Sequence, residues 1–343
     1  MKRFILPALL LLHCHLFAQL EHILEDPSVN WAAEFEIILP ADPLAFATHE
    51  DRSASIAVLK ITSEYESSLH NYVNHSLSAI LWEIAENEEW DVFANAELTR
   101  PVDSEELMQM LSGPDTIVRF DPSTYEEKVQ IAWDMRSSPQ DARFVKVRQL
   151  LTYNDEAARF HVHTLAIAPV ARNEVPRFWL KVPETEDFRP DTLIANAEVT
   201  WAARYVTNVS SPRISDFQVL KDDTDMPIME RFFYRIMADT SVLLYGGLLD
   251  EAPLPPDRRA CLFSCMDSVS TFDPETYLEH VEVFHTELMP EQIIDLQMIQ
   301  EFFWHDEDGL LYTRLVAVAP RYKFYYREGQ WYPRVGFLLR CDE

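Results

Sequence analysis

Hydrophobic positions along this chain recur with two different periods. Across residues 69–84 they fall every third or fourth position, the spacing of one helix face, at Leu69, Tyr72, Val73, Leu77, Ile80, Leu81 and Ile84. The spacing returns later at Met229, Phe232, Phe233 and Ile236. We also expect shorter helices at residues 103–111 and 258–265. The pattern therefore predicts helices near the start of each half of the chain.

Alternating apolar and polar positions follow each helical segment. Strands are predicted at residues 144–151, 160–164, 165–169 and 177–182 in the first half, with a turn at Asn154-Asp155. In the second half they are predicted at residues 296–303 and 311–318, on either side of a turn at 305–309. Helices first and strands second, in both halves, favour an α+β protein.

One block of sequence occurs twice. Asp115-Thr-Ile-Val-Arg-Phe-Asp-Pro-Ser-Thr-Tyr125 returns 152 positions later as Asp267-Ser-Val-Ser-Thr-Phe-Asp-Pro-Glu-Thr-Tyr277. Ala166-Ile-Ala-Pro169 likewise returns as Ala317-Val-Ala-Pro320. A repeat this long is typical of two copies of a domain. We therefore expect two tandem similar lobes, each with N-terminal helices followed by a small antiparallel sheet.

The lobes are assigned to residues 66–200 and 201–343. Residues 183–217 are expected to connect the two copies, and residues 19–65 form an N-terminal extension without a predicted place.

The repeated Phe-Asp-Pro-x-Thr-Tyr motif has the features of a helix start. The aspartate suits the N-cap, the proline suits the first helical position, and the two aromatic residues have hydrophobic-staple spacing. We expect the helix to run through Val129, Ala132 and Trp133 in one copy, and through Val281, Phe284 and Leu288 in the other. The prolines of Ala-x-Ala-Pro are expected to end strand pairing. The structural motif residues are Phe120, Asp121, Pro122, Tyr125, Pro169, Phe272, Asp273, Pro274, Tyr277 and Pro320.

The N-terminal residues predict export. Two positive charges precede a short apolar run that ends at Ala18-Gln19, which is typical of a signal peptide over residues 1–18. Cys14 leaves a lipid anchor open as an alternative. Three cysteines follow, Cys261, Cys265 and Cys341, and an odd number leaves at least one thiol unpaired or paired elsewhere.

Composition narrows the possible partners. The chain has 57 acidic and 29 basic residues, a net charge of −28, which disfavours nucleic acid and anionic membranes. A basic protein partner, divalent cations or solubility alone would suit this charge. Beyond the signal peptide no stretch of 18 residues is apolar enough to span a bilayer.

The sequence offers little recognisable catalytic chemistry. His161-Val-His163 would place two rings on one strand face, but no third metal ligand is evident. Asp306-Glu-Asp-Gly309 lacks the spaced ligands of a calcium loop and favours a hairpin turn. There is no P-loop, Gly-x-Gly-x-x-Gly or Gly-x-Ser-x-Gly. We therefore predict no catalytic, cofactor-binding or metal-binding residues, and no cofactor.

An ordered set of segments resembles a known family. The segments are Phe178-Trp-Leu-Lys-Val-Pro-Glu184, Ile194-Ala-Asn-Ala-Glu-Val199, Glu301-Phe-Phe-Trp304 and Thr313-Arg-Leu-Val-Ala-Val-Ala-Pro320. Together they are similar to the GldN/PorN family of periplasmic type IX secretion and gliding-motility proteins of Bacteroidetes. Two positions depart from that family: Gln300 stands where it has a lysine, and His163 stands where the second copy has Arg314.

The resemblance implies a non-catalytic structural subunit of an envelope-spanning machine. It implies a periplasmic ring, held at the outer membrane by a GldK/PorK-like lipoprotein, with a GldM/PorM-like component as a further partner. Arg314, Glu301 and Trp304 are its candidate interface residues, although Arg314 could instead pair with a neighbouring carboxylate within the sheet. The competing hypothesis is an exported two-lobed enzyme or ligand-binding protein with its site between the lobes.

Overall fold

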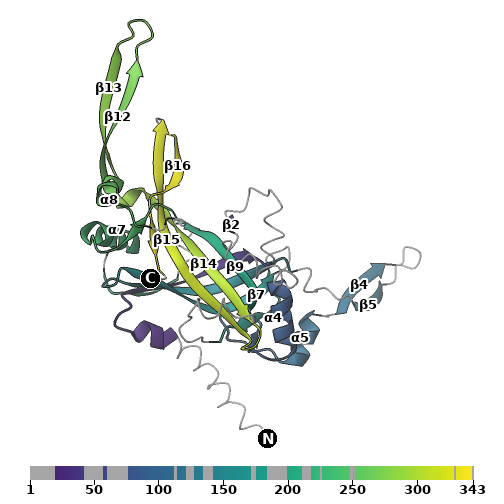
Figure 1. Ribbon diagram of the computed structural model, residues 1–343. Helices are drawn as coiled ribbons and strands as arrows, with labels where there is room; N and C mark the ends of the chain where they lie inside the picture. Colours follow the sequence, from purple (N-terminus) through teal and green to yellow (C-terminus); the bar gives the residue numbers. More distant parts are fainter. Residues whose placement is uncertain are drawn as a thin grey trace.

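The computed structural model describes residues 20–41, 57–59, 76–111, 114–120, 127–133, 142–170, 175–183, 199–210, 218–224, 226–247, 250, 252–327 and 330–341. This part of the chain forms two large antiparallel sheets and two separate two-stranded hairpins (Figure 1). The predicted signal peptide, and the beginning of the helix predicted from Leu69, lie outside the described residues.

The first sheet has six strands in the order β10-β1-β6-β7-β8-β3. These strands are β10 (Gln218–Asp222), β1 (Trp31–Pro40), β6 (Phe144–Asn154), β7 (Arg159–Val170), β8 (Trp179–Lys181) and β3 (Val92–Phe93).

The second sheet has seven strands. Its main path runs in the order β11-β17-β15-β14-β9-β2, and one further strand, β16, pairs with β15. These strands are β11 (Leu244–Tyr245), β17 (Leu338–Arg340), β15 (Leu310–Arg327), β14 (Ile293–His305), β9 (Val199–Ser210), β2 (Ala57–Leu59) and β16 (Gln330–Val335).

Four of the six predicted helices, those at residues 69–84, 103–111, 229–236 and 258–265, are confirmed among the described residues. They are α4 (Leu77–Glu86), α5 (Ser104–Leu111), α7 (Ile228–Ala238) and α8 (Pro256–Phe263). The predicted stripes are buried: α4 buries Leu77, Ile80, Leu81 and Ile84, and α7 buries Phe232, Phe233 and Ile236. The spacing predicted these faces because residues three or four apart lie on one side of a helix.

Both sheets contribute to one continuous hydrophobic core. Val147 and Tyr153 from the first sheet belong to the same buried cluster as Tyr205, Phe302 and Trp304 from the second. Each such side chain stabilises the fold by roughly 1.5–3 kcal/mol when fully buried. The α+β class is confirmed. The expected separation into two lobes is not seen, because the two halves share this core.

The helix predicted at the repeated Phe-Asp-Pro-x-Thr-Tyr motif is wrong in both copies. In the second copy the motif joins β12 (Ser264–Phe272) to β13 (Glu279–Glu287), which pair as an antiparallel hairpin. In the first copy β4 (Pro114–Phe120) pairs with β5 (Glu127–Trp133), and Val129, Ala132 and Trp133 are strand residues. Asp121, Pro122 and Tyr125 lie outside the described residues.

The second copy shows why the chain turns at this motif. Asp273 Oδ1 accepts the N–H groups of Glu275 and Thr276 at 2.8 and 3.1 Å, as a capping aspartate would. Tyr277, however, adopts a left-handed backbone with φ of 56°, which stops a helix. Phe272 and Tyr277 are exposed and form no buried staple. The flanking strands contain β-branched residues, Val269 and Thr271 before the turn and Val281, Val283 and Thr286 after it, and such residues favour strands.

The sheet topology corrects two further expectations and places the N-terminal extension, for which no position was predicted. The presumed connector at 183–217 contains β9, an interior strand of the second sheet, and the unplaced extension at 19–65 contains β1, an interior strand of the first. Pro169 does lie one residue before the end of β7. Pro320 does not end β15, because pairing with β16 begins at the next residue, Arg321.

The two sheets have matching strand orders and matching irregularities. Reading inward from the free end, β10-β1-β6-β7-β8-β3 corresponds to β2-β9-β14-β15-β17-β11. A bulge lies at Leu165 in β7 and at Val316 in β15, each immediately before Ala-x-Ala-Pro. The outermost strands are exchanged: β2 follows β1 in the chain but pairs with β9, whereas β10 follows β9 but pairs with β1.

Candidate functional site

The turn between β6 and β7, in the first sheet, is held by arginines from helix α7 of the second half. Arg231 forms ion pairs with Asp155 in this turn and with Asp222 in β10. Arg235 donates from Nε to the Asp155 carbonyl at 3.0 Å and from Nη2 to the Glu156 carbonyl at 2.9 Å. Since Arg231 is buried, these contacts fix α7 firmly against the opposite sheet.

The turn between β14 and β15, in the second sheet, is in turn held by a residue of the first half of the chain. Trp90, between α4 and β3, donates from Nε1 to the Gly309 carbonyl of this turn at 3.0 Å. Its ring also contacts that of Trp304, with 5.8 Å between ring centroids. Gly309 and Ala158, at the corresponding place in the β6–β7 turn, both have left-handed backbones, with φ of 61° and 49°.

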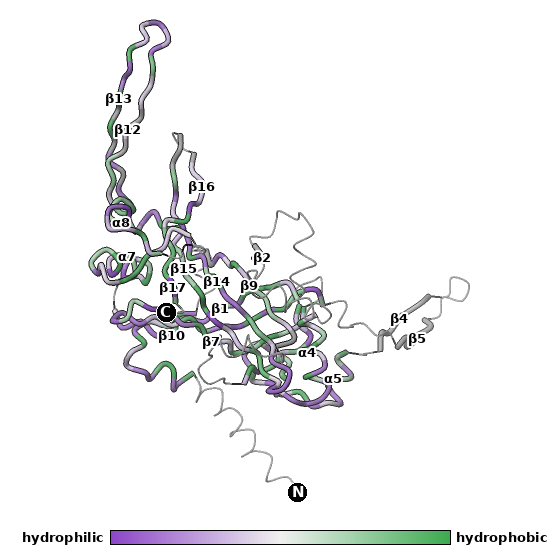
Figure 2. Tube along the Cα trace, in the orientation of Figure 1, coloured by the Kyte–Doolittle hydropathy of each residue, from purple (hydrophilic) through white to green (hydrophobic). Residues whose placement is uncertain are grey.

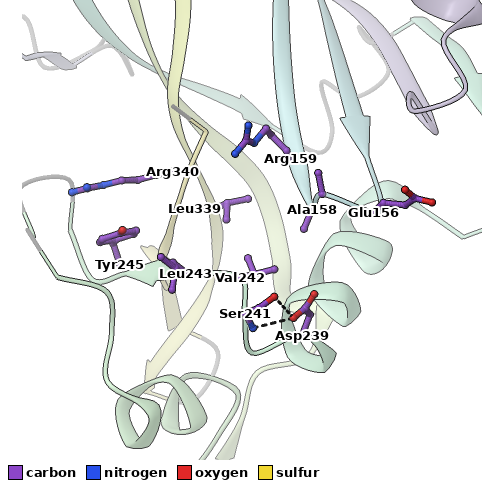
Figure 3. Close-up of a pocket in the computed structure, with 11 residues that line it drawn as sticks. Glu156, Ala158, Arg159, Asp239, Ser241, Val242, Leu243, Tyr245, Leu339 and Arg340 are labelled. Carbon is purple, nitrogen blue, oxygen red and sulfur yellow. Dashed lines mark hydrogen bonds between the residues drawn. The ribbon is translucent and has the colours of Figure 1, made fainter. Parts of the chain in front are cut away.

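A pocket of about 250 Å³ lies where the β6–β7 turn meets the second half (Figure 3). Val242 lines it at the position corresponding to Trp90, and a valine fills much less space than an indole. Figure 3 shows Ala158 and Arg159 across this space from Ser241, Val242 and Leu339, whereas the Glu156 carboxylate points away from them. The smaller side chain therefore accounts for a cavity on this side.

Two charged side chains that line the pocket, Asp239 and Arg340, already have partners. Ser241 donates to Asp239 Oδ1 from its backbone N at 2.9 Å and from Oγ at 2.6 Å, and these bonds lower the pKa of Asp239. Arg235 also pairs with Asp239 at 2.9 Å, and the Arg340 guanidinium lies over the Tyr245 ring at 4.0 Å. No histidine, cysteine or lysine is among the described residues that line it. The site can accept a small polar molecule, and its serine hydroxyl, that of Ser241, is held by the Asp239 carboxylate.

Arg314 and Glu301, two of the candidate interface residues, lie side by side in the second sheet. Glu301 in β14 has Arg204 of β9 and Arg314 of β15 as its register neighbours. Arg204 Nε lies 2.7 Å from Oε1 of Glu301, and Arg314 Nε lies 3.0 Å from Oε2. Glu301 is only 1% exposed, so the two guanidinium groups supply its charge partners. The alternative in which Arg314 pairs with a neighbouring carboxylate is confirmed.

Trp304, the third candidate interface residue, is buried. Its Nε1 donates to Asp306 Oδ1 at 2.7 Å, and its ring belongs to the shared core. The structure thus engages all three residues in contacts within the chain. Their role as interface residues stays a prediction.

The corresponding row of the first sheet has different chemistry. Glu34, Leu150 and His163 are neighbours there, in place of the arginine–glutamate–arginine row. Burial first, and the nearby His161 second, lower the pKa of His163 to about 4. Among the described residues no three histidine, cysteine or acidic side chains converge in a group that could hold a metal ion.

The hairpin of β12 and β13, residues 264–287, projects from the body and is here called the arm (Figure 1). Hydrophobic residues continue along it outside the core (Figure 2). A disulfide joins Cys261 in α8 to Cys265 in β12 at its base, whereas Cys341 is buried and its Sγ contacts the Leu339 carbonyl at 3.8 Å. This pairing was not predicted from the sequence.

Sequence reasoning missed the contribution of β1 to the fold, although a signal was present. Trp31-Ala-Ala in β1 returns as Trp201-Ala-Ala in β9, and the two strands occupy corresponding places in their sheets. Arg231, Trp90 and Gln149, which join the halves, carried no recognisable pattern in the sequence.

These features define a class of protein: an α+β body of two interlocked antiparallel sheets with projecting hairpins. Within the described residues no helix is long and apolar enough to cross a membrane. Residues 60–209 match the model of a family described as "Gliding motility associated protein GldN". The resemblance to the GldN family is thereby confirmed over this segment. No curated protein matches the chain.

Proposed function

We propose that this protein is a non-catalytic subunit of a type IX secretion and gliding-motility machine. It acts in the periplasm, where it assembles with a GldK/PorK-like outer-membrane lipoprotein and contacts a GldM/PorM-like component. The observation that carries this proposal is the GldN family match over residues 60–209. The architecture supports it, because a body fixed by contacts between its halves can carry projecting elements toward partners.

We also propose that the chain arose by duplication of one unit. The first strand of each unit, β1 or β9, lies inside that unit's own sheet. The second strand, β2 or β10, lies at the edge of the other unit's sheet, and the later strands complete the unit's own sheet. Support comes from the matching strand orders and from the matching bulges at Leu165 and Val316. Exchange of β2 and β10 would make each half depend on the other for its outer strand.

Affinity capture tests the assembly function. The full chain, tagged at its C-terminus and expressed at native level, is recovered from gently solubilised membranes of its own cells. An outer-membrane lipoprotein of the GldK/PorK class should be recovered in stoichiometric amount. Recovery of none of the type IX components, from cells that secrete normally, would overturn the proposal.

A second candidate function rests on the pocket beside Val242. An exported enzyme or ligand-binding protein would place its site between the two halves, and this pocket has one wall from each. The partners already made by Asp239 and Arg340 argue for a structural gap rather than a reactive site.

A further inference from the structure

The arm is too exposed to be stabilised by its own contacts. Its two strands pair with each other and form a separate two-stranded sheet. Apolar side chains along it are more than half exposed: Met266, Phe272, Tyr277, Leu278, Val281 and Val283 at 68, 68, 82, 69, 51 and 60%. A two-stranded ribbon alone is only marginally stable in water, and exposed apolar patches typically mark interaction sites.

The arm is firmly attached to the body at its base. Phe263 and Leu288, which flank its two strands, are buried, and the Leu288 N–H donates to the Phe263 carbonyl at 2.9 Å. The Cys261–Cys265 disulfide lies at the same end. The base is therefore fixed while the remaining length offers its surface to a partner.

Charge restricts what that partner can be. Within the arm the acidic residues are Asp267, Asp273, Glu275, Glu279, Glu282 and Glu287, and there is no lysine or arginine. A second arm would therefore repel the first, and an anionic lipid surface would do the same. The acidic and partly apolar surface of the arm therefore fits a partner whose surface is basic and partly aromatic.

The hairpin of β15 and β16 has this chemistry. Its residues 321–335 include four basic side chains, Arg321, Lys323, Arg327 and Arg334, against a single acid, Glu328, in a chain that is otherwise strongly acidic. Lys323 Nζ lies 5.2 Å above the Trp331 ring, and the Arg334 guanidinium lies 5.1 Å from the Phe324 ring. Trp331 and Tyr332 are each 44% exposed. Arg321 is paired with the buried Asp295, whereas Lys323 and Arg334 lie beside aromatic rings and can bind an acidic partner.

We propose that the arm of one copy docks on the β15–β16 hairpin of a second copy of this chain. Both hairpins project from the same side of the body in Figure 1. The arm is a separate two-stranded sheet, whereas the β15–β16 hairpin belongs to the seven-stranded sheet. The contact joins two different surfaces, so each added copy leaves one arm and one hairpin available for the next. Pro333 in β16 lacks an N–H, so the contact is made by side chains more than by a continuous backbone ladder. This inference rests on the proposed assembly function and names the contact between its subunits.

Charge reversal tests the contact with the purified chain alone. The arm variant carries Glu275→Lys and Glu279→Lys, and the hairpin variant carries Lys323→Glu and Arg334→Glu. A matched control, Glu83→Lys with Glu86→Lys, changes the exposed face of α4 to the same extent. Sedimentation velocity follows self-association from about 1 to 100 µM, at about 0.05 and 0.5 M salt.

We expect the wild type and the control to self-associate, more tightly at low salt. The arm variant should self-associate about tenfold more weakly, and so should the hairpin variant. Mixing the two variants should restore association, because the reversed arm of one then faces the reversed hairpin of the other. A wild type that stays monomeric throughout, or variants that associate like the control, would overturn the contact. Either outcome is independent of the capture of a lipoprotein, so failure here is distinguishable from failure of the proposed function.

Discussion

Gln300 donates from Nε2 to Oε1 of Gln149 at 3.1 Å, in the buried space between the two sheets. Each glutamine lies at the bulge of its own sheet, so the pair joins two corresponding positions. Both side chains are fully buried. In the first sheet, Gln149 Nε2 also reaches Thr164 Oγ1 at 3.2 Å. A polar link of this kind fixes how the sheets align, because a shift would leave buried amides without partners.

The glutamine pair leads to a prediction about stability. Gln300→Leu should lower the free energy of unfolding by about 1–3 kcal/mol, because it leaves the Gln149 amide oxygen buried without its donor. Adding Gln149→Leu should restore part of this loss, since both polar groups are then removed. Urea unfolding of the wild type, both single variants and the double variant measures the coupling. Strictly additive losses would show that the two amides act independently.

The Arg204–Glu301–Arg314 row gives a second prediction. Glu301→Leu should lower the free energy of unfolding by about 3–5 kcal/mol, because two partly buried guanidinium groups lose their common partner. Arg314→Lys keeps the charge and serves as the matched control, with a smaller expected loss because lysine cannot reproduce the guanidinium geometry. Thermal unfolding compares the variants. If Glu301→Leu is as stable as the wild type, the row does not stabilise the sheet.

A third prediction concerns pH. Burial lowers the pKa of His163 to about 4, against 6.5 for an unperturbed histidine, so the unfolded chain binds a proton more readily there. The contribution of His163 to stability is therefore complete above pH 6.5 and is lost as the pH falls from about 6.5 to 4, by at most about 3 kcal/mol. His163→Gln should flatten this part of the profile. Urea unfolding at several pH values measures the difference, and parallel curves for the two proteins would contradict the prediction.

The sequence predicted the elements that depend on local pattern. The stripe of α7 and the alternation of β6 were readable because each reflects one face toward the core. The Phe-Asp-Pro motif was misjudged because Asp273 makes the same backbone contacts in a tight turn as at a helix start. The left-handed backbone of Tyr277 and the strand-like pattern of the segments on both sides distinguish the tight turn from a helix start.

Contacts between segments that are far apart in the sequence could not be predicted from it. The exchange of β2 and β10 places each strand beside a partner more than 140 residues away. No local pattern encodes that choice, because either sheet offers a compatible edge. The contact between Trp90 and Gly309 is equally non-local, so the pocket beside Val242 was visible only when the two halves could be compared in space.

A fourth prediction concerns the disulfide at the base of the arm. The Cys261–Cys265 bond closes a very short loop, so its removal should cost at most about 2 kcal/mol in global stability by the loop-entropy relation. Replacing both cysteines with serine should instead loosen the base of the arm. Hydrogen exchange should become faster in residues 264–287 and stay unchanged in β6 and β7. Equal protection of the arm in both proteins would show that Phe263 and Leu288 alone fix it.

The pocket beside Val242 separates the two candidate functions. Val242→Trp introduces the side chain that Trp90 provides at the corresponding place, beside a turn in which Ala158 has the same left-handed backbone as Gly309. A subunit without a ligand there should tolerate the change and gain up to about 1–2 kcal/mol from the filled cavity. Val242→Ala, which enlarges the same cavity, is the control and should be less stable than the wild type.

Secretion and gliding by cells that carry Val242→Trp provide the functional measurement. If the protein is an assembly subunit, these cells should secrete and glide normally, because none of the described residues that line the pocket belongs to the arm or to the β15–β16 hairpin. A folded Val242→Trp protein that captures its partners but fails to support either process would favour a ligand in the pocket. That result would assign the pocket a functional role, because filling it would then remove something that the assembled machine requires.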